Sequence, residues 1–502
     1  MRDSEITLNP NKLVKHLKKP ANDFTKQDIM QFIQEQDIEM INFRYVADDG
    51  KLKTLNFVIL NHEHLDIVLS AGERVDGSSL FSFIEAGSSD LYVVPRFKTA
   101  FVNPFEEVPT LDILCSFYTA EGKPLESSPE YILKKACRNF KEKTGYDFKA
   151  MGELEYYVQS ERVDEYPAED QKGYHSAEPF ANFEDFRKEA MRLIAQSGGQ
   201  IKYGHTEVGN FRTEKEYFEQ QEIEFLPVSP DDAVDQLIIA KWIVRMLGKL
   251  YGVNVSFSPK ISVGKAGSGL HIHMLAEKDG KNILIENGSL SNEAKKMIAG
   301  LLYLAPSLTA FGNTIPTSYL RLVPHQEAPT YVCWGDRNRS TLVRVPLGWS
   351  SGAGKMLQNA NPNETINTRD FSNKQTFEFR VPDGSADLYL LVAGLMVACL
   401  HGLEMDNALE NAENLYAPIN IFDGRFKEKL EKLEQLPTSC FESAESLEKQ
   451  HSFFEMDGIF PKGKIDSIVK QLKSFDDKDL SERLYGKNEE IRKLVDKYIH
   501  WM

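Results

Sequence analysis

Four short segments of the sequence each place two charged or metal-ligating side chains two residues apart. They are Glu153-Leu154-Glu155, His205-Thr206-Glu207, His271-Ile272-His273 and Glu378-Phe379-Arg380. In a β-strand this spacing points both side chains to the same face. Three of the four segments have apolar, β-branched or aromatic neighbours. We therefore expect these carboxylates and imidazoles to line one face of one sheet.

Such a face would concentrate negative charge, which indicates metal binding. A single pair of this kind is more often a solvated strand face than a metal site. Four pairs on one sheet are a different case, because buried like charges a few ångströms apart repel one another and force some groups to protonate. A divalent cation removes this repulsion, so the pattern predicts a site for metal ions.

The composition narrows the class of protein. The chain has 502 residues, of which 41% are hydrophobic, and a formal net charge of -16. The length predicts two domains, and the acidic balance argues against binding to nucleic acid or to an anionic membrane. The N-terminus shows no apolar segment of a secretory signal, and the five cysteines are widely spaced. We therefore expect a cytoplasmic protein with reduced thiols.

Residues 1–120 are expected to form a small domain. Thr25 and Asp28 resemble a capping box that starts an amphipathic helix. Strands are predicted over 39–46, 52–60 and 111–118.

Residues 121–502 are expected to form a larger domain that contains the four pairs. Helices are predicted over 128–143, 183–196 and 229–252, with a Ser-Pro pair starting the first and the third. Asp279-Gly280 predicts a hairpin after the His271 strand. The longest apolar run, 388–400, is too short to cross a bilayer and predicts a buried helix. The last 90 or so residues are expected to be helical, including an amphipathic segment at 426–436.

One long segment departs from this compact pattern. The segment between Pro346 and Glu378 is rich in Gly, Asn and Ser and is longer than an ordinary connection. Loops of this kind are functional or mobile.

Seven motifs, in order, resemble the signatures of glutamine synthetase, in particular its bacterial type I form. They are Val75-Asp76-Gly77-Ser78-Ser79, Glu153-Leu154-Glu155, His205-Thr206-Glu207-Val208, Gly267-Ser268-Gly269-Leu270-His271-Ile272-His273, Arg321-Leu322-Val323-Pro324-His325-Gln326-Glu327-Ala328-Pro329, Arg337-Asn338-Arg339-Ser340 and Glu378-Phe379-Arg380. The resemblance covers nearly the whole chain. It implies an α+β fold with a β-grasp-like N-terminal domain and a larger catalytic domain, whose curved antiparallel sheet is flanked by helices.

The resemblance also implies an assembly and a reaction. Members of the family form stacked rings, here expected to be a homo-oligomeric dodecamer, with active sites shared between neighbouring subunits. The implied reaction uses ATP to phosphorylate the γ-carboxylate of L-glutamate, after which ammonia displaces phosphate to give glutamine. This chemistry brings anions together, so metal ions and arginines must neutralise the developing charge.

The resemblance assigns the carboxylates and imidazoles to two metal positions. Hard oxygen ligands with a smaller share of imidazole suit Mg²⁺ or Mn²⁺. The ion nearer the amino acid would be held by Glu155, Glu207 and Glu222. The ion that bridges the ATP phosphates would be held by Glu153, His271 and Glu378. The insert 209–221 is longer than is usual, so Glu219 and Glu224 remain alternatives to Glu222.

Further residues are assigned to the substrates by the same resemblance. Gly267, Arg321 and Arg380 would contact glutamate. His273, Arg339 and Arg344 would contact ATP, and Arg339 is also counted as catalytic. Asp76 and Tyr174 would form the ammonium pocket, and Glu327 would shield the acyl phosphate from water. As alternatives, Arg339 is an ordinary surface charge and Tyr174 serves only packing.

The sequence departs from the family pattern at several positions. Ala266 replaces an asparagine expected near the glutamate α-amino or carboxylate group. A long loop that ends in Asn373-Lys374-Gln375-Thr376 replaces the basic pair usually found before the Glu-x-Arg motif, and whether Lys374 substitutes for that pair stays open. Tyr416 resembles an adenylylated tyrosine, but Ala417-Pro418 follows it, so we expect it to be unmodified.

Three functions remain open at this point. The first is a glutamine synthetase. The second is a γ-glutamyl ligase that uses an amine other than ammonia, which Ala266 favours and Asp76 opposes. The third is an inactive structural or regulatory member of the family, which the complete metal-ligand set disfavours.

Overall fold

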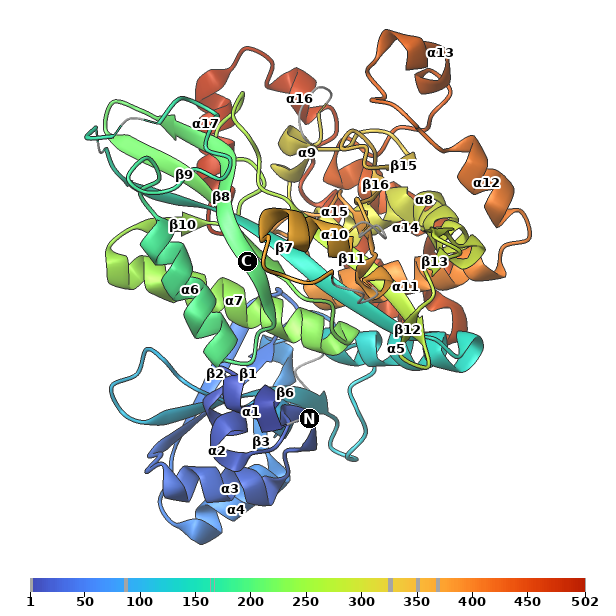
Figure 1. Ribbon diagram of the computed structural model, residues 1–502. Helices are drawn as coiled ribbons and strands as arrows, with labels where there is room; N and C mark the ends of the chain where they lie inside the picture. Colours follow the sequence, from blue (N-terminus) through green and yellow to red (C-terminus); the bar gives the residue numbers. More distant parts are fainter. Residues whose placement is uncertain are drawn as a thin grey trace.

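The computed structural model describes residues 3–84, 89–162, 164–166, 168–323, 328–348, 353–366 and 371–501. Figure 1 shows a smaller N-terminal unit below a larger unit that contains most of the helices. Each unit is built on its own sheet and has its own apolar core. The α+β class expected from the sequence is confirmed.

The N-terminal sheet has the strand order β2-β1-β6-β4-β3, and β5 pairs with β6. Its strands are β1 Met40–Val46, β2 Leu52–Val58, β3 Glu73–Asp76, β4 Asp90–Pro95, β5 Phe101–Val102 and β6 Thr110–Tyr118. The helices of this unit are α1 Asp3–Leu8, α2 Lys12–Leu17, α3 Lys26–Glu35 and α4 His62–Ala71. The capping box is confirmed, because Asp28 N donates to Thr25 Oγ1 and Thr25 N donates to Asp28 Oδ2. β1 and β6 run parallel, whereas the other pairs are antiparallel.

The larger sheet has the order β15-β16-β17-β11-β7-β9-β8, with β10 on β7 and β12 on β11. Its strands are β7 Asp147–Glu161, β8 Ile201–Arg212, β9 Glu216–Phe225, β10 Asn254–Ser256, β11 Leu270–Lys278, β12 Lys281–Asn282, β15 Trp334–Asp336, β16 Val343–Val345 and β17 Phe377–Phe379. A separate hairpin pairs β13 Ile285–Glu286 with β14 Ser289–Leu290. The sheet is largely antiparallel, as expected, but β15 and β16 run parallel.

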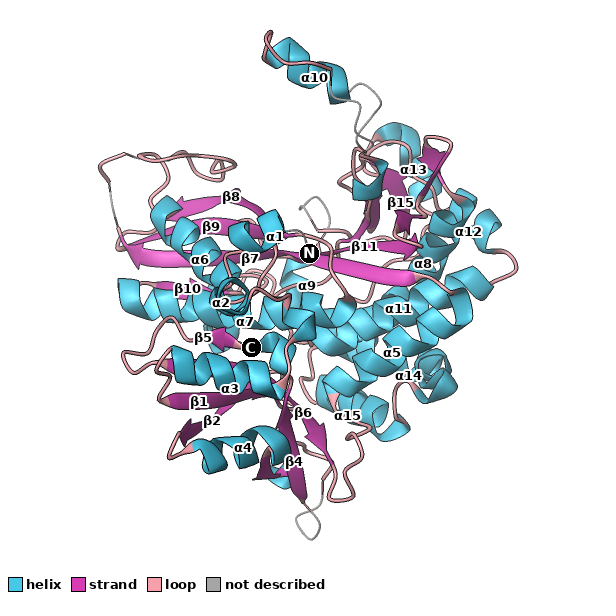
Figure 2. Cartoon of the chain, turned by 60° about the horizontal axis from the view of Figure 1, so that its bottom comes forward, coloured by secondary structure: helices cyan, strands magenta, loops and turns pink. Residues whose placement is uncertain are grey.

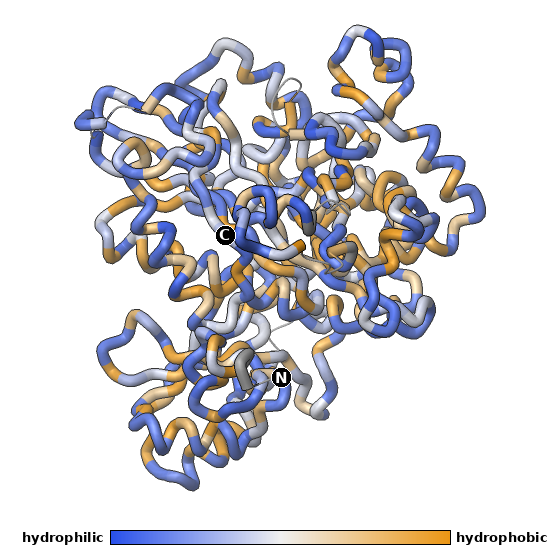
Figure 3. Tube along the Cα trace, viewed as in Figure 1, coloured by the Kyte–Doolittle hydropathy of each residue, from blue (hydrophilic) through white to orange (hydrophobic). Residues whose placement is uncertain are grey.

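Several helices lie below this sheet in the view of Figure 2, and Figure 3 shows the hydropathy along the same chain. The helices of this unit are α5 Pro129–Thr144, α6 Glu184–Gln196, α7 Pro230–Tyr251, α8 Asn292–Gly312, α9 Ser318–Arg321, α10 Ala353–Ala360, α11 Leu388–Glu404, α12 Ala408–Asn414, α13 Lys427–Leu430, α14 Cys440–Glu455, α15 Lys462–Lys473, α16 Leu480–Arg483 and α17 Asn488–Tyr498. Leu237 of α7 lies against Gly152 of β7. A Cβ added at Gly152 would lie 2.9 Å from Leu237 Cδ1. α7 therefore supports the strand that carries Glu153 and Glu155.

Local signals set the ends of the predicted helices. α5 and α7 both begin at a proline that follows a serine, and each ends at a glycine in the left-handed region, Gly145 and Gly252. α11 is buried along most of its length, as expected for the run 388–400. Within the described ranges, no single helix is long and apolar enough to cross a membrane. Taken together, α11 and α12 have the length and composition of a membrane span, but the chain bends by 109° between them.

The structure corrects the expectation for residues 426–436. Only α13, four residues long, is α-helical in this segment. The following residues pair with a distant strand-like segment instead: Val332 N donates to Glu434 O at 2.9 Å, and Leu436 N donates to Thr330 O at 3.0 Å. Phe426 is buried in a small separate core. The amphipathic spacing therefore reflects tertiary packing of a mostly non-helical chain.

Part of the long Gly-, Asn- and Ser-rich segment is a helix that was not predicted. α10 lies within it and is set apart from the main body in Figure 2. Its Met356 and Leu357 side chains are exposed.

Candidate active site

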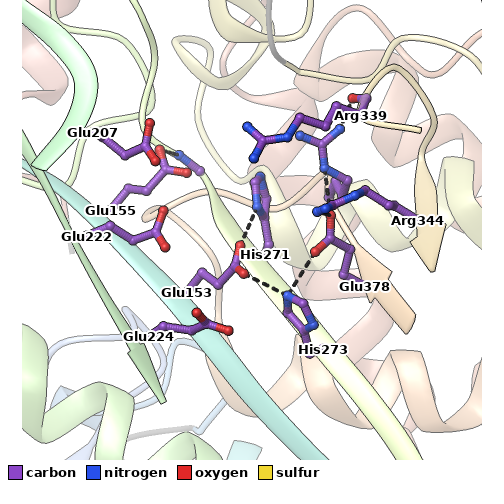
Figure 4. A network of polar contacts seen from close by, with 12 residues as sticks. Glu153, Glu155, Glu207, Glu222, Glu224, His271, His273, Arg339, Arg344 and Glu378 are labelled. Carbon is purple, nitrogen blue, oxygen red and sulfur yellow. Dashed lines mark hydrogen bonds and ion pairs between the residues drawn. The ribbon is translucent and has the colours of Figure 1, made fainter. Parts of the chain in front are cut away.

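The four sequence pairs lie in the same sheet, as predicted. Antiparallel pairing places Glu153 opposite His271 and places His273 opposite Glu378. The side chains of this half of the site point toward one another from β7, β11 and β17 (Figure 4). The register of three neighbouring strands therefore assembles residues that are more than two hundred positions apart in sequence.

Glu153 is the centre of this half of the site. Its Oε2 lies 2.8 Å from His271 Nδ1 and its Oε1 lies 2.8 Å from His273 Nε2. His273 Nε2 also lies 2.9 Å from Glu378 Oε2. Burial alone would lower the pKa of His273, but the two carboxylates raise it to about 10. Burial likewise opposes ionisation of Glu153, yet the two imidazoles hold its pKa well below its usual range.

A second group of ligands lies on β7, β8 and β9. Residues Glu155 and Glu222 are opposite each other in the β7–β9 pairing, and His205 is opposite Glu222 in the β8–β9 pairing. His205 Nε2 lies 3.5 Å from Glu222 Oε1, and His205 Nδ1 lies 3.9 Å from Glu207 Oε1. The register of β8 shifts between Thr206 and Asn210. This second group thus consists of the carboxylates of Glu155, Glu207 and Glu222 and the imidazole of His205.

The carboxylates of this second group strongly oppose one another's ionisation. Burial and the nearby carboxylate of Glu207 raise the pKa of Glu155 to about 8. Burial and the carboxylates of Glu153 and Glu155 raise the pKa of Glu222 well above its usual range. Glu155 Oε2 accepts hydrogen bonds from Gly269 N at 2.8 Å and from Gln220 Nε2 at 2.9 Å, which do not offset the repulsion.

The donor set fits divalent cations. Two groups have ligand atoms that all lie within 4.8 Å of one another: Glu153, Glu224 and His273, and His205, Glu207 and Glu222. In addition, Glu224 Oε2 is buried without a hydrogen-bond donor among the described residues. Carboxylate oxygens with one or two imidazoles are ligands that Mg²⁺ and Mn²⁺ accept, and a cation would neutralise the buried charge.

The geometry separates the three glutamates that the sequence left open. Glu222 faces His205 in the second group. Glu219 lies on the other face of β9, where it accepts hydrogen bonds from Asn182 N at 2.8 Å and Tyr217 Oη at 2.7 Å. Its environment is that of a structural carboxylate.

The sequence reasoning kept Glu224 only as an alternative to Glu222, and it did not assign His205 to a metal ion. Glu224 is two residues after Glu222, so it points to the same face of β9 and reaches the group around Glu153. The alternation Gln220, Glu222, Glu224 was the signal for this placement. His205 was noted as a member of a pair, and its position opposite Glu222 required the β8–β9 register.

The predicted arginines border the same site. Glu378 Oε1 forms ion pairs with Arg344 Nη1 at 2.9 Å and with Arg380 Nε at 3.0 Å. Arg380 Nη1 also donates to the backbone oxygen of Arg339. Arg321 Nη1 donates to Val381 O at 2.8 Å.

A cavity of ≈ 310 Å³ joins the predicted glutamate contacts to the metal ligands. Its lining includes Gly267, Arg321 and Arg380 together with Glu155 and His271. A Cβ at Gly269 would lie 2.5 Å from Arg321 Nη2, so a glycine is required for the arginine to approach the strand. Ala266 also lines this cavity.

Tyr174 belongs to an aromatic group beside the second ligand group. Its ring stacks on His175 with centroids 4.2 Å apart, and His175 lies 4.2 Å from His205. The Arg339 Cζ lies 6.0 Å from the Tyr174 ring centre. Tyr174 is 48% exposed, which argues against a purely packing role.

One predicted residue, Asp76, is not brought to this site by the single chain. Asp76 ends β3 in the N-terminal unit, remote from β7 and β11 in Figure 1. It is exposed and accepts hydrogen bonds from the hydroxyls of Ser78 and Ser79 at 2.7 Å each, which hold its pKa below its usual range. Glu327 lies outside the described residues.

The positions at which the sequence departs from the family pattern have the following neighbours. Ala266 N donates to Gln171 Oε1 at 2.7 Å, and Tyr157 Oη donates to Ala266 O at 2.8 Å. Tyr416 Oη donates to Asp336 at 3.2 Å. Lys374 is exposed, near the Phe371 ring.

Sequence profiles of two domains match the chain. The profile described as "Glutamine synthetase, beta-Grasp domain" matches residues 37–120, and "Glutamine synthetase, catalytic domain" matches residues 126–483. A glutamine synthetase of Clostridium saccharobutylicum is 29% identical over 431 residues, covering 84% of this chain and 88% of that protein. One from Thermotoga maritima is 28% identical over 468 residues, covering 90% and 96%.

Solved structures share the fold. A Plasmodium falciparum glutamine synthetase superimposes with a TM-score of 0.74 at 21% identity, covering 92% of this chain and 99% of that one. A structure titled "Apo GmaS without ligand" has a TM-score of 0.72 at 19% identity, covering 91% and 97%. At these identities the structural likeness concerns the fold alone.

Proposed function

The chain belongs to the glutamine synthetase family, and from this membership we propose that it ligates ammonia to the γ-carboxylate of L-glutamate. In this proposal ATP phosphorylates the glutamate, and ammonia then displaces phosphate from γ-glutamyl phosphate to give glutamine. The observation that carries the proposal is the position of Glu153 between His271 and His273, facing a second buried group of carboxylates. Phosphoryl transfer from ATP to a carboxylate brings two anions together, and this concentration of cation ligands supplies the ions that neutralise them.

The metal ligands divide between the two substrates. Glu155, Glu207, Glu222 and His205 would hold an ion on the glutamate side, and Glu153, His271, Glu378 and Glu224 would hold one on the ATP side. When bound, Mg²⁺ or Mn²⁺ supplies positive charge to the phosphate and carboxylate oxygens. His273 Nε2 lies between the Glu153 and Glu378 carboxylates and orients both toward the ATP side.

Arginines would bind and align the anionic groups. Arg321 and Arg380 line the cavity that also contains Glu155 and Gly267, so they are placed to hold the glutamate carboxylates. A planar guanidinium suits that task because it donates two parallel hydrogen bonds. Arg339 and Arg344 would contact the ATP phosphates, and Arg344 is kept in place by its ion pair with Glu378.

The ammonium pocket requires a second copy of the chain. Asp76 is exposed at the end of β3 in the N-terminal unit, and Figure 1 shows β3 away from β7 and β11 of its own chain. In a ring, Asp76 of one subunit would approach Tyr174 of the next. We therefore propose that the protein forms a homo-oligomer, a dodecamer of two stacked rings. In this assembly Asp76 helps to bind and deprotonate ammonium. Glu327 would close over the acyl phosphate and exclude water.

A larger amine is the second candidate substrate. The exposed ring of Tyr174, stacked on His175, forms an aromatic edge beside His205, whose Nδ1 lies 3.9 Å from Glu207 Oε1. An aromatic edge next to carboxylates can bind an alkylammonium through apolar and cation–π contacts. Ala266 also leaves more room in the glutamate cavity than an asparagine would.

A phosphate-release assay separates these candidates. Purified protein would be incubated with L-glutamate, ATP, Mg²⁺ and either ammonium or one of a panel of primary amines, and the γ-glutamyl products identified by mass spectrometry. The glutamine synthetase proposal expects the highest kcat/KM with ammonium. Preference for an alkylamine would replace it with the broader ligase, and no turnover with any amine would favour an inactive member of the family.

A further inference from the structure

A second cavity lies between the two units, apart from the carboxylate site. Its volume is ≈ 530 Å³, within the range that holds a small organic ligand. The cavity is bounded by the β1–β2 hairpin, one face of α7, β10, the start of α11 and the C-terminal His500. Ligand binding here would therefore bridge the N-terminal unit and the catalytic unit.

One face of α7 supplies both apolar and basic side chains to this cavity. Ile238, Lys241, Trp242, Arg245 and Lys249 all line it, and their spacing of three or four residues places them on one stripe of the helix. Like charges four residues apart destabilise a helix. The three bases at successive i, i+4 positions therefore call for a counter-charge.

No carboxylate among the described residues forms an ion pair with these bases. Lys51 adds a fourth basic side chain from the hairpin, and Asp387 is the only acidic residue among the described residues that line the cavity. Asp387 caps α11 by accepting from Leu390 N at 3.2 Å. Of the 33 ion pairs found among the described residues, none includes Lys51, Lys241, Arg245 or Lys249. This excess of positive charge occurs in a chain whose net charge is -16.

Lys241 is buried and Arg245 is partly buried. Lys241 is 6% exposed, and its Nζ donates to Gly384 O at 2.7 Å, which leaves two of the three ammonium hydrogens for other acceptors. Burial and the charge of Arg245 lower the pKa of Lys241 to about 7, although Asp383 opposes the shift. Arg245 Nη2 is buried and has no hydrogen-bond acceptor among the described residues. Its guanidinium lies 4.9 Å from the centre of the Phe257 ring.

The other walls of the cavity are suited to the hydrocarbon part of a ligand. Trp242, Val255, Leu388 and Tyr389 line the same space. A ligand with a carboxylate or phosphate head and a flat or branched hydrocarbon body would satisfy both kinds of surface, because a guanidinium binds such oxyanions with paired hydrogen bonds.

We propose that this cavity is a second ligand site, which binds a small organic anion through Arg245 and Lys241 and packs its apolar body against Trp242. Lys249 and Lys51 are exposed and attract the anion at the mouth. The site is independent of the ligase reaction, so its test does not depend on the identity of the amine substrate.

Three probes of similar shape test the chemistry: phenyl phosphate, phenylacetate and the neutral 2-phenylethanol. Binding to the full-length protein is measured by calorimetry and by the fluorescence of Trp242, with Trp242→Phe as the variant that loses the site-specific signal. The anionic probes should bind about tenfold or more tightly than 2-phenylethanol, since hydrogen bonds to charged groups contribute this much. The tighter of the two anions identifies the head group.

Matched variants test the location. Arg245→Gln should weaken the anionic probes about tenfold, and the exposed Lys249→Gln should weaken them less. Arg344→Gln, in the carboxylate site, should leave the affinity unchanged. Without probe, Arg245→Gln should unfold at the same or a higher temperature, because a partly buried charge that has no ion pair is removed. The proposal is overturned if neither anion binds, if 2-phenylethanol binds equally well, or if Arg344→Gln rather than Arg245→Gln abolishes binding.

Discussion

Glu155 and Glu222 lie directly opposite each other on the antiparallel strands β7 and β9, and both carboxyl groups are buried. This pairing places two like charges at one point of the sheet, where each raises the cost of ionising the other. Burial and the Glu207 carboxylate raise the pKa of Glu155 to about 8. At neutral pH the metal-free site therefore carries protons that a cation must displace.

The first prediction follows from that displacement. Binding of Mn²⁺ at pH 7 should release protons, because a carboxyl group that coordinates a cation is ionised. Calorimetric titrations in buffers of different ionisation enthalpy will measure the number released. Glu155→Gln should release fewer protons and bind the glutamate-side ion more weakly. Binding enthalpies that do not depend on the buffer would contradict the raised pKa.

The same shift predicts how stability depends on pH without metal. The folded-state pKa of Glu155, about 8, is above the ordinary glutamate value of 4.5. Its contribution to stability is thus fully present below about pH 4.5 and is lost as the pH rises through about 8. The Tm of EDTA-treated protein should fall over that interval, and Glu155→Gln should reduce the fall. Saturation with Mn²⁺ should flatten it, since the ionised carboxylate is then paired.

The second prediction concerns the number of metal ions. Metal-free protein should bind at least two Mn²⁺ per subunit, and Glu378→Ala should remove the ATP-side ion because Glu378 ends the Glu153 and His273 network. Electron paramagnetic resonance of free Mn²⁺ will count the bound ions. The matched control is Glu219→Gln, on the opposite face of β9, which should retain both ions. A titration that shows no bound Mn²⁺ at millimolar concentration would contradict the two-metal site.

The third prediction concerns assembly. The active form should be a large ring, because Asp76 ends β3, which Figure 1 shows away from β7 and β11 of its own chain. Separately inactive Asp76→Ala and Glu378→Ala subunits, when dissociated and reassembled together, should regain part of the activity through mixed sites. Analytical ultracentrifugation will give the size of the active species. An active monomer, or mixtures with no recovered activity, would contradict shared sites.

The fourth prediction distinguishes the roles of Asp76 and Glu327. Asp76→Ala should depress glutamine formation from ammonium much more than γ-glutamyl transfer to hydroxylamine, which is already neutral and needs no deprotonation. Glu327→Ala should instead raise ATP hydrolysis relative to glutamine formed, because water reaches the acyl phosphate. Both ratios can be measured from phosphate and product in one reaction. Unchanged ratios in both variants would contradict these roles.

Much of the architecture was determined by local sequence signals. The Ser-Pro starts and glycine ends of α5 and α7, the capping box at Thr25 and the apolar run of α11 all act within a few residues. Their effect depends on backbone geometry and on burial of an apolar face, and both can be deduced from spacing. The two-residue spacing of the charged pairs likewise determined that each pair shares one face of a strand.

Only the tertiary structure decided which carboxylates meet. Glu219, Glu222 and Glu224 are equivalent by residue type, and the β8–β9 and β7–β9 registers turn Glu222 toward His205 and Glu219 toward the backbone of Asn182. The same dependence on long-range pairing made residues 426–436 mostly non-helical. Strand register is set by contacts between distant segments, because a shift of one residue reverses every side chain. A single sequence therefore supplies the ligand types, and the folded sheet selects among them.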